Sequence, residues 1–165
     1  MAIYHFSVKT ISRGAGRSAV ACAAYRSGEK LIDERYGKEQ DYTKKTGVDF
    51  KNIYAPIYTK PSLTNRQTLW NAVEKAERRK DATLAREFEI AFPHELNQRQ
   101  REQLLDELCS QIVNRHSVVV DAVIHAPHTK SGTDERNYHA HIMFTSRHID
   151  QDTGGFASKK NREFN

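Results

Sequence analysis

Residues 138–147 read YHAHIMFTSR, and this stretch decides the fold of the chain. Apolar side chains at positions 140, 142 and 144 alternate with His139 and His141, which is the two-residue period of a β-strand. Residues 117–125 alternate in the same way, and a polar loop with a proline and a glycine joins the two segments. We therefore predict two neighbouring antiparallel strands whose apolar faces share one core.

The rest of the chain switches between helical and extended patterns. Ser18, Asn65 and Asn97 are each suited to cap a following amphipathic helix. We expect helices from Ser18 to about Leu31, from Asn65 to about Lys80 and from Asn97 to about Asn114, and strands over 2–10, 41–44, 51–55 and 86–92. Strands and helices mixed in this order predict an α+β fold, with a central antiparallel β-sheet and helices packed on it as a two-layer sandwich.

Length and composition limit the class of protein. The chain has 165 residues, with 26 Lys and Arg against 21 Asp and Glu, and so a formal net charge of +5. This length suits one domain, residues 1–165, and the 38% hydrophobic content is typical of a globular chain. No apolar run is long enough to span a bilayer, and the N-terminus lacks a secretory pattern. Because Cys22 and Cys109 are too few for a disulfide framework, we expect a cytoplasmic protein with reduced thiols and no membrane partner.

The polar faces of the predicted strands collect residues suited to metal binding and acid–base chemistry. On one shared surface we expect His5, Glu87, Glu89, His125, His139 and His141. Side chains at i and i+2 of a strand point the same way, and the adjacent strand lies about 5 Å away. His125, His139 and His141 are therefore expected to converge as metal ligands, with His128 in the loop as a competitor for the third position. Taken singly, each histidine is equally consistent with a structural or exposed residue.

Tyr25 is the second feature, and it lies in the first predicted helix among small residues. Ser18, Ala21, Cys22 and Gly28 occupy its i−7, i−4, i−3 and i+3 positions, which leaves room for a backbone or a ligand to approach. The alternative is a tyrosine that packs in the core above the sheet. Basic residues near this helix and the C-terminus suit phosphate groups, or else form a solvated basic surface. The candidate DNA contacts are His5, Arg13, Arg17, Arg26, Lys159 and Lys160.

Several blocks of the sequence carry a resemblance to a known family. They are MAIYHFSVKTISRGAGRSAVACAAYRSGEK, DYTKKTGV, LWNAVEKAERRK, LAREFEIAFPHEL, VIHAP and NYHAHIMFTSR. In this order they resemble MobA/MobL-type plasmid relaxases, the MobQ group within the HUH endonuclease superfamily. The resemblance covers essentially the whole chain, and its most specific parts are the tyrosine helix and the His-Ala-His strand. It implies that this chain is a relaxase domain from the N-terminal part of a longer protein.

The resemblance further implies a metal-dependent DNA strand transferase. Carried onto this sequence, Tyr25 is the nucleophile, His125, His139 and His141 are metal ligands, and Glu87 orients a metal-bound histidine or takes the tyrosine proton. The implied metal is Mn²⁺ or Mg²⁺, although imidazoles also suit other transition metals. The implied reaction is site- and strand-specific nicking of single-stranded DNA at a plasmid origin of transfer, with a 5′-phosphotyrosine product. Accessory relaxosome proteins and a type IV secretion coupling protein are the further expected partners.

Two other interpretations of these residues stay open. Three histidines with an open fourth position would also suit a zinc hydrolase, which would not need Tyr25. A DNA-binding module with structural histidines would bind DNA in a salt-dependent way without forming a covalent link. The weaker nucleophile candidates are Tyr36, Tyr42, Tyr54, Tyr58 and Tyr138. Of these, Tyr138 is expected to point to the face opposite His139.

Overall fold

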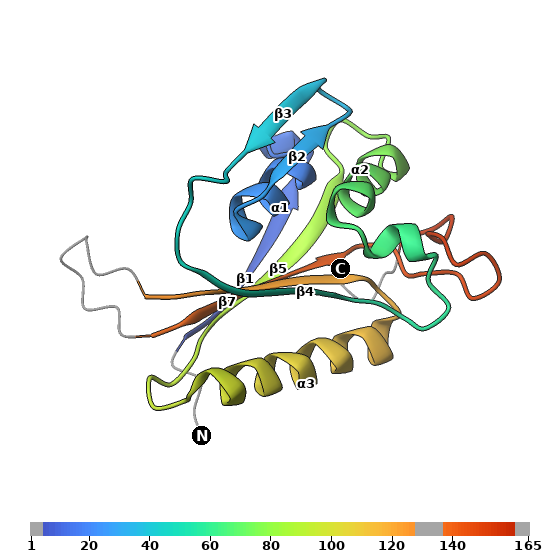
Figure 1. The fold of residues 1–165 in the computed structure, drawn as a ribbon. Helices are drawn as coiled ribbons and strands as arrows, with labels where there is room; N and C mark the ends of the chain where they lie inside the picture. The colour runs from blue at the N-terminus through green and yellow to red at the C-terminus, as the bar shows by residue number, and fades with distance from the viewer. Residues whose placement is uncertain (1–4, 128–136, 161–165) are drawn as a thin grey trace.

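A five-stranded antiparallel sheet runs through the middle of the computed structural model, which describes residues 5–127 and 137–160 (Figure 1). The strands lie in the order β1 (His5–Ser12), β5 (Thr83–Ala91), β7 (His139–Thr145), β6 (Val120–His125) and β4 (Val48–Tyr54). Each strand is antiparallel to its neighbours. Strands β6 and β7, predicted from residues 117–125 and 138–147, are paired with each other, so their predicted pairing is confirmed.

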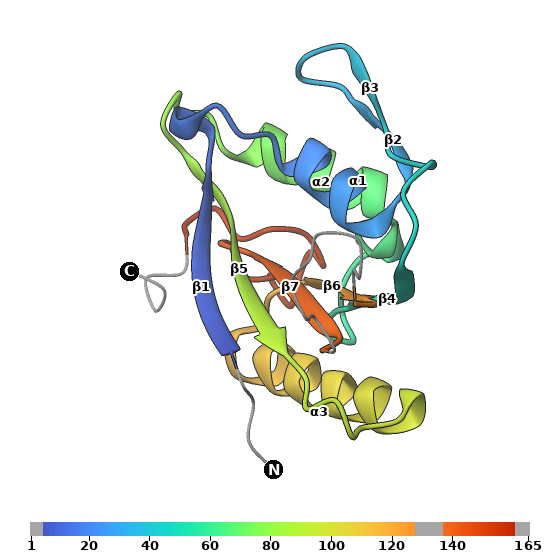
Figure 2. The ribbon, with the colours of Figure 1, turned by 90° about the vertical axis from the view of Figure 1, so that its left-hand side faces the viewer.

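Helices cover both faces of this sheet. They are α1 (Ala19–Ser27), α2 (Arg66–Ala76) and α3 (Gln98–His116). Helices α1 and α2 lie on one face and α3 lies on the other (Figures 1 and 2). Each face has its own hydrophobic cluster, with Met143 beneath α1 and α2 and Ile142 against α3. The expected α+β class is confirmed, but the described chain forms three layers where the sequence predicted two.

The helices begin at the residues that the sequence predicted. The side chains of Ser18 and Asn65 each accept a hydrogen bond from the backbone N–H three residues later. Asn97 and Gln100 form a reciprocal capping box at the start of α3. None of the helices in residues 5–127 and 137–160 combines the length and apolar character needed to cross a lipid bilayer.

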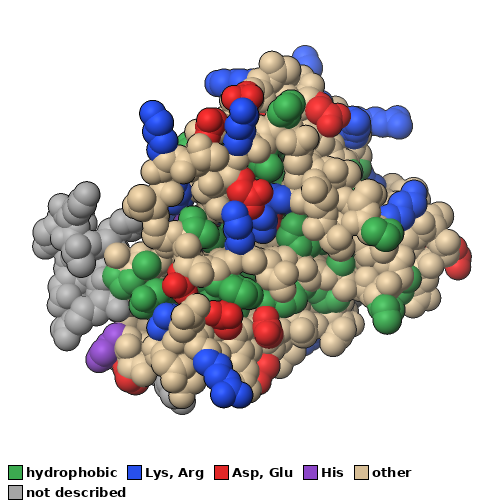
Figure 3. All heavy atoms as spheres, in the orientation of Figure 1, with side chains coloured by type: hydrophobic (Ala, Val, Ile, Leu, Met, Phe, Trp, Pro, Cys, Tyr) green, Lys and Arg blue, Asp and Glu red, His purple; other side chains and the backbone are tan. Residues whose placement is uncertain are grey.

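The first helix ends earlier than predicted. Gly28 has a φ of 66°, a left-handed conformation that glycine adopts freely and at which helices commonly end. Leu31, the predicted end, lies instead in β2 (Lys30–Asp33), which pairs with β3 (Lys38–Asp41) in a separate hairpin. This hairpin projects beyond α1 and α2 (Figure 1), and Lys and Arg side chains are prominent around it on the molecular surface (Figure 3).

Arg13, which was predicted to contact DNA, has a structural role instead. It is 7% exposed, and its Nη1 donates to the carbonyl oxygens of Glu77 and Arg79, at 2.7 Å each. Its Nη2 donates to Glu74 Oε1 at 2.7 Å, while Glu74 Oε2 accepts from the N–H of Ala19 at 2.8 Å. Arg13 therefore joins the end of α2 to the start of α1. The predicted phosphate contact is wrong because this guanidinium is buried and already bonded.

A buried polar network ties α2 to the sheet and yields a stability prediction. The Asp121 side chain is 2% exposed and accepts hydrogen bonds from Arg66 Nη2 and Trp70 Nε1, both at 2.8 Å. Asp121→Asn removes the more buried of the two carboxylates that pair with Arg66, while Glu29 remains, so it should lower the free energy of unfolding by about 2 kcal/mol. Urea denaturation measures this change. Arg79→Gln is the control, because it removes an exposed ion pair and should change little; an equal loss in both variants would contradict the argument.

Candidate functional site

The strand register places the predicted polar residues on the sheet face that α1 and α2 cover. In one row across the sheet, His5 lies opposite Ala91, Ala91 opposite His139, and His139 opposite His125. In the next row, Glu89 lies opposite His141. Directly opposed residues of antiparallel strands point to the same face. That face carries His5, Glu87, Glu89, His125, His139 and His141.

His125 connects this face to the last turn of α1. Its Nε2 lies 2.6 Å from the backbone oxygen of Arg26, and it donates because a carbonyl oxygen only accepts. Burial lowers the pKa of His125 to about 4, in spite of this hydrogen bond. The ring is therefore neutral near pH 7, and its Nδ1 carries a free lone pair.

Glu87 lies at the centre of the face and is paired with Arg26. The Glu87 carboxylate is 0% exposed, and Arg26 binds both of its oxygens through Nε and Nη2. Burial by itself would raise the pKa of Glu87, but His141 and Arg26 together lower it to about 2. Arg26 was predicted to contact DNA; its side chain is 11% exposed and is used by Glu87, so the structure gives it a role within the protein instead.

His141 lies between the two carboxylates of β5. Its Nδ1 is 3.7 Å from Glu87 Oε2, and its Nε2 is 3.7 Å from Glu89 Oε1. Both distances exceed hydrogen-bonding range, and the buried Nδ1 has no hydrogen-bond partner. The rings of His141 and His125 lie side by side, with centroids 4.7 Å apart. This imidazole is therefore held close to negative charge and keeps an unpartnered nitrogen.

Tyr25 is an exposed residue of α1 at the edge of this face. It is 53% exposed, so the alternative of a tyrosine sealed in the core does not hold. The next residue, Arg26, contacts both His125 and Glu87. The helical turn that carries Tyr25 therefore lies at the same end of the sheet as the histidines. The edge of its ring meets the ring of Tyr42, with centroids 5.3 Å apart.

Lys45 is a residue of this site that the sequence analysis did not single out. Its Nζ donates to the backbone oxygen of Tyr25 at 2.7 Å and lies 3.8 Å from the centroid of the Tyr25 ring. Burial, together with the charge of Arg26, lowers the pKa of Lys45. Lys45 belongs to the block DYTKKTGV, but it lies in a loop, where hydrophobic periodicity gives no signal for its position.

The histidines lie on adjacent strands, but their side chains do not form a finished metal site. Within the described part of the chain, no group of three or more His, Cys, Asp or Glu is arranged so that it could hold a metal ion. The rings of His125 and His141 lie side by side, but the described side-chain positions do not group the three histidines as ligands of one ion. His128, the competing third ligand, lies outside the described residues.

The remaining predicted DNA contacts are spread over the surface. His5, Arg17 and Lys159 are exposed, and Arg17 Nη2 lies 3.4 Å from Cys22 Sγ. Lys160 Nζ is bonded to the backbone oxygen of Thr83 at 3.1 Å. Thr83 begins β5, whereas the histidines lie level with the end of that strand. Lys160 is therefore at the opposite end of the sheet from the histidines.

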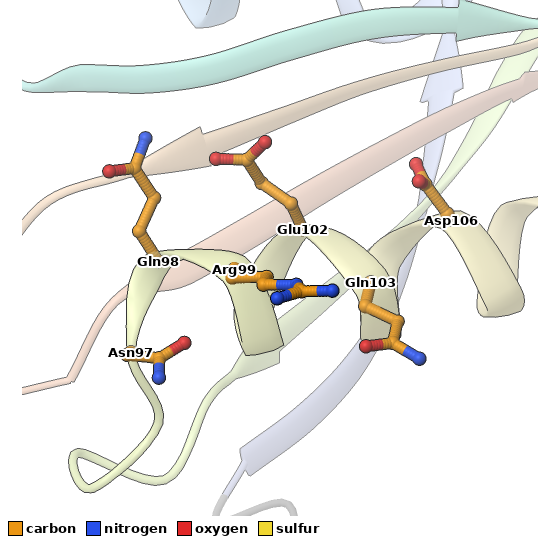
Figure 4. Close-up of a pocket in the computed structure, with 6 residues that line it drawn as sticks. All are labelled: Asn97, Gln98, Arg99, Glu102, Gln103 and Asp106. Carbon is orange, nitrogen blue, oxygen red and sulfur yellow. The ribbon is translucent and has the colours of Figure 1, made fainter.

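A large surface hollow lies away from the histidine face. It has a volume of about 730 Å³ and is lined by α3 and its N-cap residue (Figure 4). The lining residues are Asn97, Gln98, Arg99, Glu102, Gln103 and Asp106. Because α3 covers the other face of the sheet, this hollow is separate from the tyrosine and histidine residues.

The fold and the site together define a class: α+β proteins whose central strands carry histidines next to a helix with an exposed tyrosine. The chain belongs to the MobA/MobL family, whose sequence profile matches residues 17–164. Mobilization protein MobL of Acidithiobacillus ferridurans is 39% identical, over 92% of this chain and 44% of that protein. Probable mobilization protein MobA of Bifidobacterium longum is 35% identical, over 98% of this chain and 28% of that protein. This chain thus spans less than half the length of these curated relatives.

A solved structure has the same fold. It is titled "Molecular Basis of Vancomycin Resistance Transfer in Staphylococcus aureus", and its chain superposes with a TM-score of 0.83 and 30% identity. The match covers 98% of this chain and 78% of that one. A further relative, conjugal transfer protein TraA of Rhizobium radiobacter, is 35% identical over 97% of this chain and 15% of that protein. The similarity therefore extends over nearly the whole of this chain.

Proposed function

We propose that this chain is the relaxase domain of a plasmid mobilization protein, which nicks one DNA strand at an origin of transfer. Membership of the MobA/MobL family and the names of the relatives, mobilization and conjugal transfer proteins, support a role in plasmid mobilization. The nicking reaction, the single-stranded origin DNA, the accessory relaxosome proteins and the type IV secretion coupling protein are all parts of the proposal.

The observation that carries the proposal is an exposed phenol beside a face of histidines. Tyr25 is 53% exposed, and the adjacent Arg26 contacts both His125 and Glu87. A phosphate bound at this face would therefore lie next to the helical turn that carries the phenol. A zinc hydrolase would have no use for a phenol in this position, which favours the relaxase.

The proposed reaction is a transesterification. The Tyr25 Oη attacks the scissile phosphate, so that an oxygen–phosphorus bond forms while the bond from phosphorus to the 3′ oxygen breaks. The phenol loses its proton and the 3′ oxygen gains one. The products are a 5′-phosphotyrosine and a free 3′-hydroxyl, and the reverse attack by that hydroxyl rejoins the strand.

We assign Glu87 a positioning role and not the role of a base. Its pKa of about 2 makes it a weak base, and both of its oxygens are bound by Arg26. Because it lies 3.7 Å from His141 Nδ1, a small shift would let it accept a hydrogen bond from that imidazole. Carboxylates that hold a histidine in this way commonly orient metal ligands.

His125, His139 and His141 are the proposed ligands of a divalent cation, Mn²⁺ or Mg²⁺ or another transition metal. Two observations support this assignment: the neutral His125 ring donates its Nε2–H to a backbone carbonyl, and the buried, unpartnered Nδ1 of His141 lies beside Glu87, so that a hydrogen bond to Glu87 would leave Nε2 of that ring for the cation. A histidine that gives its other N–H to a carbonyl is a common metal ligand. When bound, the cation would offset the negative charge of the phosphate oxygens.

A covalent-adduct assay tests the proposed function. The 165-residue chain is mixed with MnCl₂ and single-stranded oligonucleotides that tile the DNA flanking its gene, and the products are separated under denaturing conditions. We expect a protein–DNA adduct that peptide mapping assigns to Tyr25. An adduct on another tyrosine would reject the assignment. Hydrolysis without an adduct would support a zinc hydrolase, and salt-dependent binding alone would support a DNA-binding module.

A further inference from the structure

We propose that Lys45 is a positioning residue for Tyr25: its ammonium group holds the phenol ring and stabilises the negative charge that develops on it during attack. This inference rests on the proposed function of Tyr25. It adds a residue that lies outside the histidine strands and outside the tyrosine helix.

The loop that carries Lys45 is packed closely against the end of α1. The N–H of Tyr42 donates to the backbone oxygen of Glu29 at 3.1 Å, and the N–H of Lys45 donates to the oxygen of Tyr42 at 3.0 Å. A Cβ on Gly28 would lie 3.2 Å from Val48 Cγ2 and 3.9 Å from Lys45 Cβ, so the two segments approach to van der Waals distance. Lys45 is therefore held in place by its backbone as well as by its ammonium group.

The ammonium group of Lys45 contacts Tyr25 in two ways. It donates to the Tyr25 backbone oxygen at 2.7 Å, and it lies 3.8 Å from the centroid of the ring. This is a cation–π contact, since the distance is well within about 6 Å. The Tyr42 ring meets the same phenol edge-on, at an interplanar angle of 89°. Lys45 and Tyr42 together restrict the ring while leaving Tyr25 53% exposed to a substrate.

The charge of Lys45 is available to this site because no carboxylate of residues 5–127 and 137–160 neutralises it. Two other cations of this region are paired, Arg26 with Glu87 and Lys51 with Glu29. No ion pair of Lys45 is found among the described residues. The groups that contact the Tyr25 ring are thus the Lys45 ammonium and the ring of Tyr42.

A fixed cation next to a nucleophile favours its reactive form. As the phenol loses its proton and bonds to phosphorus, negative charge passes through the ring that Lys45 faces, so the cation is attracted more strongly in the transition state than before it. Removing one preorganised electrostatic donor from an active site typically costs about 10²–10³-fold in rate. Because Lys45 faces the ring and not the oxygen, we expect a smaller loss, about 10–100-fold.

Three variants test the role of Lys45. Lys45→Met keeps the aliphatic stem without the charge, Lys45→Arg keeps the charge, and Lys44→Met is the matched control on the exposed neighbouring lysine. Single-turnover adduct formation at saturating oligonucleotide should slow about 10–100-fold in Lys45→Met. It should stay within about threefold of the parent in Lys45→Arg and Lys44→Met. A Lys45→Met variant that binds DNA less tightly, with an unchanged rate at saturation, would show an ordinary phosphate contact and overturn the inference.

A second measurement does not depend on DNA cleavage. Tetranitromethane nitrates ionised phenols, so mass-spectrometric mapping of Tyr25 nitration reports how well the site stabilises that form. Nitration of Tyr25 should be several-fold slower in Lys45→Met and restored in Lys45→Arg. If nitration and adduct formation are both unchanged in Lys45→Met, the Lys45 inference fails while the proposed function stands. If neither the parent nor any variant forms an adduct but nitration of Tyr25 depends on Lys45, the proposed relaxase function is wrong, while the electrostatic effect of Lys45 on Tyr25 stands.

Discussion

Tyr25→Phe should abolish covalent attachment of DNA, with a loss of at least about 10³-fold in the rate of adduct formation. The phenol oxygen is the proposed nucleophile, and a phenylalanine offers no atom that can bond to phosphorus. The fold should be unaffected, because Tyr25 is 53% exposed and its ring contacts with Lys45 and Tyr42 need no hydroxyl. Exposed substitutions of this kind usually change stability by less than about 0.5 kcal/mol. Denaturing gels measure the adduct, and thermal unfolding checks the fold.

Two other tyrosines serve as controls for this prediction. Tyr42→Phe keeps the edge contact with Tyr25 and should form the adduct at close to the parent rate. Tyr138 packs on the opposite side of the sheet, where its ring faces Arg101 of α3 with Cζ 3.5 Å from the centroid. This agrees with the orientation predicted for it, so Tyr138→Phe should also be active. An adduct that persists in Tyr25→Phe and disappears in either control would move the nucleophile to that residue.

His141→Ala should remove metal-dependent cleavage while sparing most of the affinity for DNA. We expect cleavage to fall at least about 10²-fold, because the proposed cation, which would offset phosphate charge, would lose one of its three proposed ligands. Titration calorimetry with MnCl₂ should show at least about tenfold weaker binding. DNA affinity should stay within a few-fold, since it comes mainly from phosphate contacts elsewhere on the surface.

Two further variants separate a metal role from general damage. His94→Ala removes an exposed histidine beside Glu95 and should leave metal binding and cleavage unchanged. Glu87→Gln keeps the shape of the carboxylate without its charge and should give an intermediate loss, about 10–100-fold. The metal assignment is wrong if His141→Ala binds Mn²⁺ and cleaves DNA as the parent does. The positioning role of Glu87 is wrong if Glu87→Gln cleaves normally at every pH.

Much of the fold could be predicted because its signals are local. The alternation in residues 138–147 identifies β7, and Ser18, Asn65 and Asn97 mark the helix starts that the structure has. The same alternation groups the histidines, because a period of two places every second side chain on one face. The helical pattern of α1 continues to Leu31 in the sequence, whereas the left-handed conformation of Gly28, with a φ of 66°, ends the helix at Ser27.

The ion-pair partners of Arg13 and Arg26 could not be predicted from the sequence. Arg13 and Arg26 lie near Tyr25 in the sequence and were both predicted to contact phosphates. Each is instead paired with a glutamate 61 residues away, Arg13 with Glu74 and Arg26 with Glu87. A basic residue has the same sequence pattern whether it faces solvent or a distant carboxylate. Its partner is set by which helix packs on which strand.

The amino-acid sequence thus establishes which side chains share each strand face and where each helix begins, since both follow from neighbours within a few residues. The number of layers, the partners of the arginines and the contact of Lys45 with Tyr25 emerge only on folding. They depend on elements that are far apart in the chain, whose approach is governed by the burial of two separate apolar faces. No pattern within a few residues of sequence indicates which distant elements pack against each other.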